Sequence, residues 1–370
     1  MTHRAVFLSS LSLSATLLLY APPAQAGKRQ ARETQDLMEQ SPVLPAMVAD
    51  VYALGSSPPA DPVVGLAIGG RDMQLDEALS GAAATLAMQS LPGQSEGAIR
   101  WAALRSGFPF PVVGMAFGRS TTPDAPPSVL AFLDEAQEQG LVLGLARARL
   151  DKDDVWVALS ARALPVGAFA RQYQLDEEIS LDLPAAVGWS LVDPQGGRLH
   201  GTGSIKVGLD LAGEWLLRLE LPGTSLSLPL FVDQPMPTAR GLHDQAIPVS
   251  SREEAILLAE ALLGDLRAAA GLDRWQGDPT LDLVLSKPMA QGGSVALDRS
   301  SLMERLRLSG FVNGVQVETC QASSVADCLE RLYDSPDFRV ALLDPGFEYL
   351  GIEARVQPQG VHLLIGLAAE

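Results

Sequence analysis

Histidine, the side chain that proteins most often use for proton transfer and for zinc, is scarce in this sequence. Of four histidines, His3 lies in an N-terminal export signal, and His200, His243 and His362 remain. No two of these three have the helix or loop spacing that would bring two imidazoles to one metal ion. We therefore predict single packed or solvated histidines, with no metal ligand, no catalytic residue and no cofactor.

Serine and aspartate clusters do not predict chemistry either. The stretch G-T-G-S-I, Gly201 to Ile205, lacks the second flanking glycine of a G-x-S-x-G nucleophile elbow. Asp151, Asp153 and Asp154 could begin a calcium loop, but Val155 stands at its fifth position and no glutamate closes it. We expect a solvated hairpin turn at these aspartates instead.

Cys320 and Cys328 are the only two cysteines. In an oxidising compartment they can form a disulfide that closes a short loop, for which the entropic model gives roughly 2–3 kcal/mol. A reactive thiol would need a partner such as histidine, and none lies near them in sequence. We predict a structural disulfide.

Residues 1–26 have the three parts of a secretory signal: a basic start, an apolar core from Val6 to Leu19, and the small-x-small pattern Ala24-Gln25-Ala26. The mature chain is expected to begin near Gly27 and to be periplasmic or secreted. No cysteine follows the cleavage site, so a lipid anchor is not expected. No later segment approaches the roughly 18 apolar residues of a membrane-spanning helix.

The formal net charge of the whole chain is −17, and removing the signal with its one arginine gives 26 − 44 = −18. This charge would repel nucleic acid and anionic membranes. We therefore expect neither nucleic acid nor an anionic membrane as a partner.

The residues considered above lie in a sequence that contains an internal repeat. Four stretches match in the same order: Asp76–Leu79 with Asp278–Leu281, Ile99–Val113 with Leu302–Gln316, Val129–Ala136 with Val325–Leu332, and Leu143–Leu145 with Leu350–Ile352. Repeated order of this kind indicates tandem duplication. We expect each copy to contain two helices, a short strand, a helix and a strand pair.

Helix starts in the second copy are predicted from capping boxes. The boxes are Ser251 with Glu254, Ser301 with Glu304, and Ser324 with Asp327. The region from Gly351 to Leu367 is predicted to form two strands joined by a turn at Gln357–Gly360.

Between the copies, apolar and polar residues alternate in short runs separated by turn residues, as in a small antiparallel Ig-like β-sandwich. The runs are Ile179–Leu183, Val187–Val192, Ile205–Leu211, Trp215–Leu221 and Leu226–Val232. Trp189, Trp215, Arg198 and Arg218 could line a glycan-binding face, but the alternation places Trp215 in the core.

The predicted fold class is α+β. We expect a signal peptide at 1–26, a degenerate first copy at 27–163, a β-sandwich with a Pro-rich linker at 164–240, and the second copy at 241–370.

Four motifs in the second copy stand in a familiar order. An opening helix ends in A-A-A-G-L (Ala268–Leu272), D-P-T-L (Asp278–Leu281) begins another, and S-P-D-F-R (Ser335–Arg339) and L-G-I (Leu350–Ile352) follow. Residues 250–370 thereby resemble the CAP superfamily of cysteine-rich secretory, antigen 5 and pathogenesis-related proteins, in its minimal bacterial form. The resemblance implies an α-β-α sandwich with a central groove, where the family often holds a divalent metal on two histidines and two acids.

The residues that bind the metal in the family are not found at the corresponding positions of this chain. Phe338 stands where the Ser-Pro element of the family has its histidine, and Glu318 stands near the position of a family glutamate without the residues that complete its motif. We interpret Glu318, Phe338 and Arg339 as a candidate groove in which Phe338 supplies apolar surface. Ser335, Pro336 and Gly351 are the preserved structural motif.

These features favour a non-catalytic exported protein that binds or interacts through CAP-like scaffolds. Its partner would be an envelope or extracellular protein, a glycan or an apolar ligand. Two alternatives stay open: a carrier of an apolar, lipid-like or sterol-like ligand, and an envelope hydrolase or protease.

Overall fold

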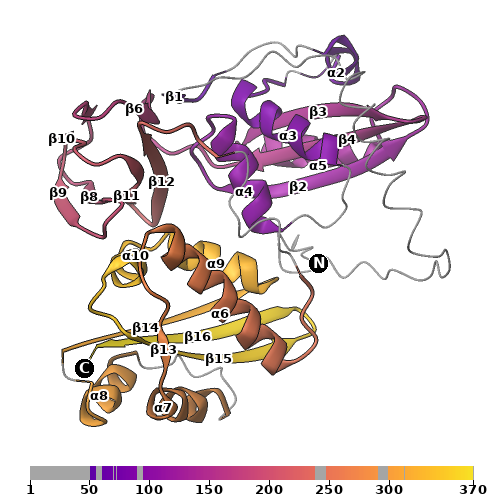
Figure 1. The fold of residues 1–370 in the computed structure, drawn as a ribbon. Helices are drawn as coiled ribbons and strands as arrows, with labels where there is room; N and C mark the ends of the chain where they lie inside the picture. Colours follow the sequence, from indigo (N-terminus) through magenta and orange to yellow (C-terminus); the bar gives the residue numbers. More distant parts are fainter. Residues whose placement is uncertain are drawn as a thin grey trace. The chain divides into compact units, whose positions relative to one another are not determined.

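The computed structural model describes residues 51–55, 61–69, 71, 73–89, 95–237, 247–290, 299–311 and 313–369 (Figure 1). The predicted signal, His243 and the boundary near residue 240 lie outside these ranges. The chain divides into unit 1, residues 1–93 and 102–168, and unit 2, residues 94–101 and 169–370. No helix in the described ranges has both the length and the apolar character needed to cross a membrane. The four-part division given above stays a proposal.

Unit 1 is built on a three-stranded antiparallel sheet of order β2-β4-β3. Its elements are β1 (Val51–Tyr52), α2 (Pro62–Ala67), α3 (Glu77–Gln89), β2 (Val112–Ser120), α5 (Pro127–Glu138), β3 (Val142–Leu150) and β4 (Asp153–Ala161), and α4 (Glu96–Arg105) has residues in both units. Helices α2 and α5 pack on one sheet face around the buried Trp156. Helix α3 packs on the other face. The close contact is possible because Gly144 of β3 has no side chain, and a Cβ atom there would lie 2.5 Å from the backbone of Leu79.

The first part of unit 2 is a five-stranded sheet of order β6-β12-β11-β8-β9 with a two-stranded ribbon of β10 and β7. The strands are β5 (Phe169–Ala170), β6 (Gln172–Tyr173), β7 (Glu178–Leu181), β8 (Gly188–Val192), β9 (Arg198–Thr202), β10 (Ile205–Gly208), β11 (Gly213–Leu221) and β12 (Thr224–Val232). Alternation predicted β7, β8, β10, β11 and β12, and it placed Trp215 in the core, where the structure has it. The two sheets are unequal in size, and β6 pairs with β12 in parallel, so the Ig-like arrangement stays a prediction.

The second part of unit 2 is a layered α-β-α structure (Figure 1). Its elements are α6 (Arg252–Ala269), β13 (Gln276–Gly277), α7 (Pro279–Ala290), α8 (Arg299–Leu308), β14 (Gly314–Ala322), α9 (Val325–Tyr333), α10 (Pro336–Leu343), β15 (Tyr349–Gln357) and β16 (Gly360–Ala369). The sheet order is β13-β15-β16-β14. Along β16, Leu363 and Ile365 pack with α6, α9 and α10, whereas Leu364 and Ala368 pack with α7 and α8. This alternation is what builds a core on each face of the sheet.

Two of the three predicted capping boxes are confirmed. The Ser251 and Ser324 side chains accept hydrogen bonds from the backbone N–H groups of Glu254 and Asp327, three residues on. The box at Ser301 is wrong, because α8 already begins at Arg299 and Ser301 lies inside its first turn.

The sheets of the two helix-and-sheet parts have the same strand order, β2-β4-β3 and β14-β16-β15. In each part an aspartate accepts from a leucine N–H three residues on, Asp76 from Leu79 at 2.8 Å and Asp278 from Leu281 at 2.9 Å. A Cβ added to Gly351 would lie 2.7 Å from Leu281 Cγ, as one added to Gly144 would collide with Leu79. The aspartate, leucine and glycine that the sequence matches between the two parts therefore make similar contacts in each.

Candidate functional site

The S-P-D-F-R element forms the first half of α10, with Ser335 at the N-cap position and Pro336 at the first helical position. The Phe338 side chain is 0% exposed and belongs to the core that α6, α9 and α10 form with the sheet. Phe338 therefore packs inside the protein, and the structure does not place it on the wall of an open groove.

Arg339 lies on a different side of α10 and is 1% exposed. Its guanidinium donates to Glu214 Oε1 at 3.1 Å and to the Glu214 carbonyl oxygen at 2.5 Å, and it stacks on the Tyr333 ring at 4.6 Å. Glu214 belongs to β11 of the five-stranded sheet. The arginine therefore joins the α-β-α part of unit 2 to its β-rich part.

Other contacts extend this junction along α10. Arg198 of β9 pairs with Asp337 at 2.5 Å, and the Ser227 hydroxyl of β12 donates to the Asp334 carbonyl at 2.8 Å. We call the surface formed by Asp334, Asp337 and Arg339 the α10 junction. Its two α10 residues, Asp337 and Arg339, stand on either side of Phe338 in the sequence.

Glu318, the third candidate groove residue, lies on β14 with its side chain largely buried. It accepts from Arg299 at 2.6 Å and from the Gln316 amide at 2.6 Å. Burial raises the pKa of the Glu318 carboxyl above its usual value, while Arg299 and Gln316 act in the opposite direction and Asp337 adds to the increase. Its contacts are internal, like those of Phe338 and Arg339.

The predicted Cys320–Cys328 disulfide is present and links β14 to α9, with 5.5 Å between the two Cα atoms. Within the described ranges, no three histidine, cysteine or acidic side chains gather where they could share a metal ion. His200 is exposed on β9, and His362 Nε2 lies 2.7 Å from the Thr319 hydroxyl.

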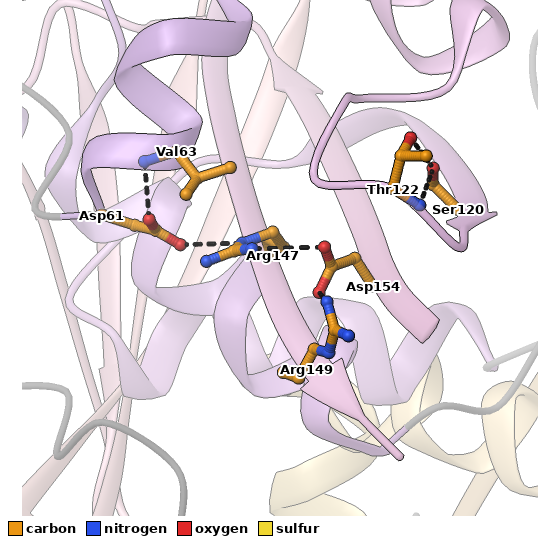
Figure 2. Close-up of polar contacts among 7 residues, drawn as sticks. All are labelled: Asp61, Val63, Ser120, Thr122, Arg147, Arg149 and Asp154. Carbon is orange, nitrogen blue, oxygen red and sulfur yellow. Dashed lines mark hydrogen bonds and ion pairs between the residues drawn. The ribbon is translucent and has the colours of Figure 1, made fainter. Parts of the chain in front are cut away.

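The prediction of a solvated turn at Asp151, Asp153 and Asp154 is wrong for Asp154. Asp151 does lie in the β3–β4 turn with φ 53°, but the Asp154 side chain is 0% exposed. Figure 2 shows it between Arg147 and Arg149, whose guanidinium groups each lie 3.2 Å from its oxygens. Arg147 also reaches Asp61, the N-cap of α2, at 3.1 Å, so this network anchors α2 to the sheet.

Arg267 of α6 is a structural residue for which the sequence gives no signal. Its buried guanidinium donates to four backbone carbonyls, those of Asp273, Leu342, Asp344 and Phe347, at 2.6–3.3 Å. Burial lowers the pKa of Arg267, and the nearby Asp344 and Asp273 oppose that change. One side chain thereby fixes the loops before β13 and β15.

A hollow of about 520 Å³ opens on the surface of the α-β-α part. It is lined by the start of α6, by α7 and by β15 through Ser250, Ser251, Arg252, Ser286, Glu353, Ala354, Arg355 and Val356. Sequence reasoning did not identify this site. Six of the eight lining residues carry polar or charged groups, and two of these are arginines.

No model of a protein family matches the chain, and no curated protein matches it. Among solved structures, an outer surface protein from Borrelia burgdorferi is 14% identical to this chain, with a TM-score of 0.29. The match covers 34% of this chain and 99% of that protein. A cysteine-rich secretory protein from Staphylococcus aureus is 11% identical, with a TM-score of 0.29, and the match covers 62% of this chain and 83% of that protein. An extracellular Bacillus anthracis protein containing an SCP domain is 14% identical, with a TM-score of 0.27, and the match covers 61% of this chain and 81% of that protein. At these scores the likenesses carry no weight for function, which is argued below from the chain's own residues.

Proposed function

We propose that this chain is an exported, non-catalytic binding protein made of two CAP-like copies and a β-rich part between them. The shared strand order and the matching Asp-Leu-Gly contacts in the two helix-and-sheet parts support the two copies. The preserved order of the second copy's motifs supports the CAP-like assignment.

The α10 junction is the observation that carries this proposal. Where the family has a histidine, Phe338 fills the core, and the neighbouring Arg339 is bound to Glu214. Glu318 is held by Arg299. The phenyl ring of Phe338 has no heteroatom and can neither coordinate zinc nor transfer a proton, so these positions serve architecture.

Capture from envelope extract tests this function. The chain beginning at Gly27, immobilised, is expected to retain a specific envelope or extracellular component that mass spectrometry of proteins and lipids identifies. In parallel, zinc titrated calorimetrically into the same chain is expected to show no site that Glu318→Ala removes. Micromolar zinc binding that Glu318→Ala abolishes, or extract capture no better than that of an unrelated acidic protein, would refute the proposal.

A further inference from the structure

Among the residues that the structure describes, the outer edge of β15 has a strand partner only at its start. Strand β13 pairs only with Tyr349 and Leu350, and β15 continues to Gln357. In residues 247–290, 299–311 and 313–369, no further strand pairs on this side. An uncovered edge presents rows of N–H and C=O groups to which another extended segment can bind.

The hollow described above lies along this same edge. Its walls are the start of α6 on one side and α7 on the other, and its floor includes Glu353 to Val356. The hollow therefore lies beside the β15 backbone, between the start of α6 and α7.

The charges in the hollow favour an acidic occupant. The Arg252 side chain is 48% exposed, and Arg355 makes no hydrogen bond or ion pair with any residue that the structure describes. The hydroxyls of Ser250 and Ser286 in the same lining already donate to Glu254 Oε2 and to the Leu283 carbonyl, and the Ser251 hydroxyl accepts from the Glu254 N–H. The two guanidinium groups are therefore the donors that this lining offers to a carboxylate.

A carboxylate of the chain itself already occupies part of this site. Glu353 accepts from Arg252 Nε at 2.5 Å and from Arg252 Nη2 at 2.7 Å, and its Oε1 also accepts from the Ala354 backbone N–H at 3.2 Å. Gln276 N donates to Glu348 O on the β13 side, so the even-numbered residues of β15, including Ala354, direct their backbone groups to that edge. The Glu353 carboxylate thus covers a donor that an incoming strand would use.

A second acid is close to this pair. The pKa of the Asp282 carboxyl is raised by burial, then by Asp278 and Glu353, and is lowered by Arg252. An incoming acid therefore competes with carboxylates of the chain for Arg252 and does not enter an empty basic pocket.

We propose that the partner is an extended acidic peptide segment that adds to β15 as a strand. A carboxylate of the segment replaces Glu353 on Arg252, a second one pairs with Arg355, and the freed Ala354 N–H bonds to the backbone of the segment. This inference rests on the proposed binding function and names the chemistry of its partner.

The test uses the full chain and a labelled short peptide of alternating threonine and glutamate, with binding followed by fluorescence anisotropy. Arg355→Ala is expected to weaken binding about tenfold, the usual effect of losing one charge-assisted contact. Glu353→Gln is expected to strengthen it several-fold, because the internal competitor for Arg252 is weakened. Arg305→Ala, which removes an exposed arginine of α8, is the matched control and is expected to leave binding unchanged.

Two control peptides separate strand addition from charge attraction alone. Replacing glutamate with lysine is expected to abolish binding, and methylating alternate backbone nitrogens, which removes strand hydrogen bonds while keeping the charges, is expected to do the same.

Three results would overturn the inference: unchanged affinity in Arg355→Ala, undiminished binding of the methylated peptide, or self-association of Glu353→Gln without peptide binding. The last would mean that Glu353 only protects the edge from other copies of the chain. Extract capture that survives Arg355→Ala would leave the proposed function intact and reject this site alone.

Discussion

Replacing Phe338 with aspartate is expected to lower the free energy of unfolding of unit 2 by about 4 kcal/mol or more. The side chain is fully buried among apolar groups of α6, α9 and the sheet, where a carboxylate has no partner. Domains are stable by only about 5–15 kcal/mol, so a loss of this size leaves unit 2 close to unfolding at room temperature. Urea denaturation followed by circular dichroism measures it.

Phe338→Leu is the matched control, because it keeps an apolar side chain of similar volume and is expected to cost less than about 1.5 kcal/mol. Equal stability of the aspartate and leucine variants would contradict the core position of Phe338. For the same reason, Phe338→Asp cannot be used to probe a binding surface, since loss of folding would remove any partner.

Replacing Arg339 with methionine is expected to destabilise unit 2 by about 3–5 kcal/mol, the usual cost of removing one member of a buried ion pair. The loss arises because the Glu214 carboxylate keeps its burial without its guanidinium. The double variant Arg339→Met with Glu214→Leu is expected to be more stable than Arg339→Met alone, because an apolar pair replaces the unbalanced charge.

A double-mutant cycle measured by urea denaturation checks this coupling. Additive losses in the double variant would show that Arg339 and Glu214 act independently, which contradicts the α10 junction. Arg198→Met, which breaks the more exposed pair with Asp337, is expected to cost less than about 1 kcal/mol and controls for loss of a surface charge.

Local patterns predicted the local structure well. Alternation identified five strands of the β-rich part, two capping boxes mark true helix starts, and the cysteine spacing gave the disulfide. In each case the interacting residues are close in sequence or repeat with the period of one element. Strand β9 was missed because its residues are mostly exposed and show no alternation.

Long-range partners could not be predicted. Arg339 and Glu214 are 125 positions apart, and neither residue type indicates the other. The Arg267 partners are backbone carbonyls, which carry no sequence signal at all. Asp154 looked like a turn residue because the sequence does not give the register of β3 with β4, which places Asp154 opposite Arg149 and within reach of Arg147.

The candidate groove illustrates a limit that helix geometry imposes. Phe338 and Arg339 are adjacent on a helix, where neighbouring side chains point about 100° apart and do not share a surface. From the sequence, we interpret Phe338 as the replacement of a histidine in the CAP-like motif that this stretch resembles. The sequence could not show that Arg198 and Glu214 of the five-stranded sheet contact Asp337 and Arg339.

Amide hydrogen exchange of the full chain over residues 336–344 tests most directly whether α10 serves architecture. Its backbone bonds include Arg339 N to Ser335 O and Asp344 N to Val340 O, each 2.9 Å, between a core and a covering sheet. The α10 junction predicts that these amides exchange as slowly as those of the β15–β16 hairpin, because both open only when unit 2 unfolds. Exchange at the rate of an exposed loop, while the hairpin stays protected, would contradict the structural role of α10 and reopen its surface as a binding groove.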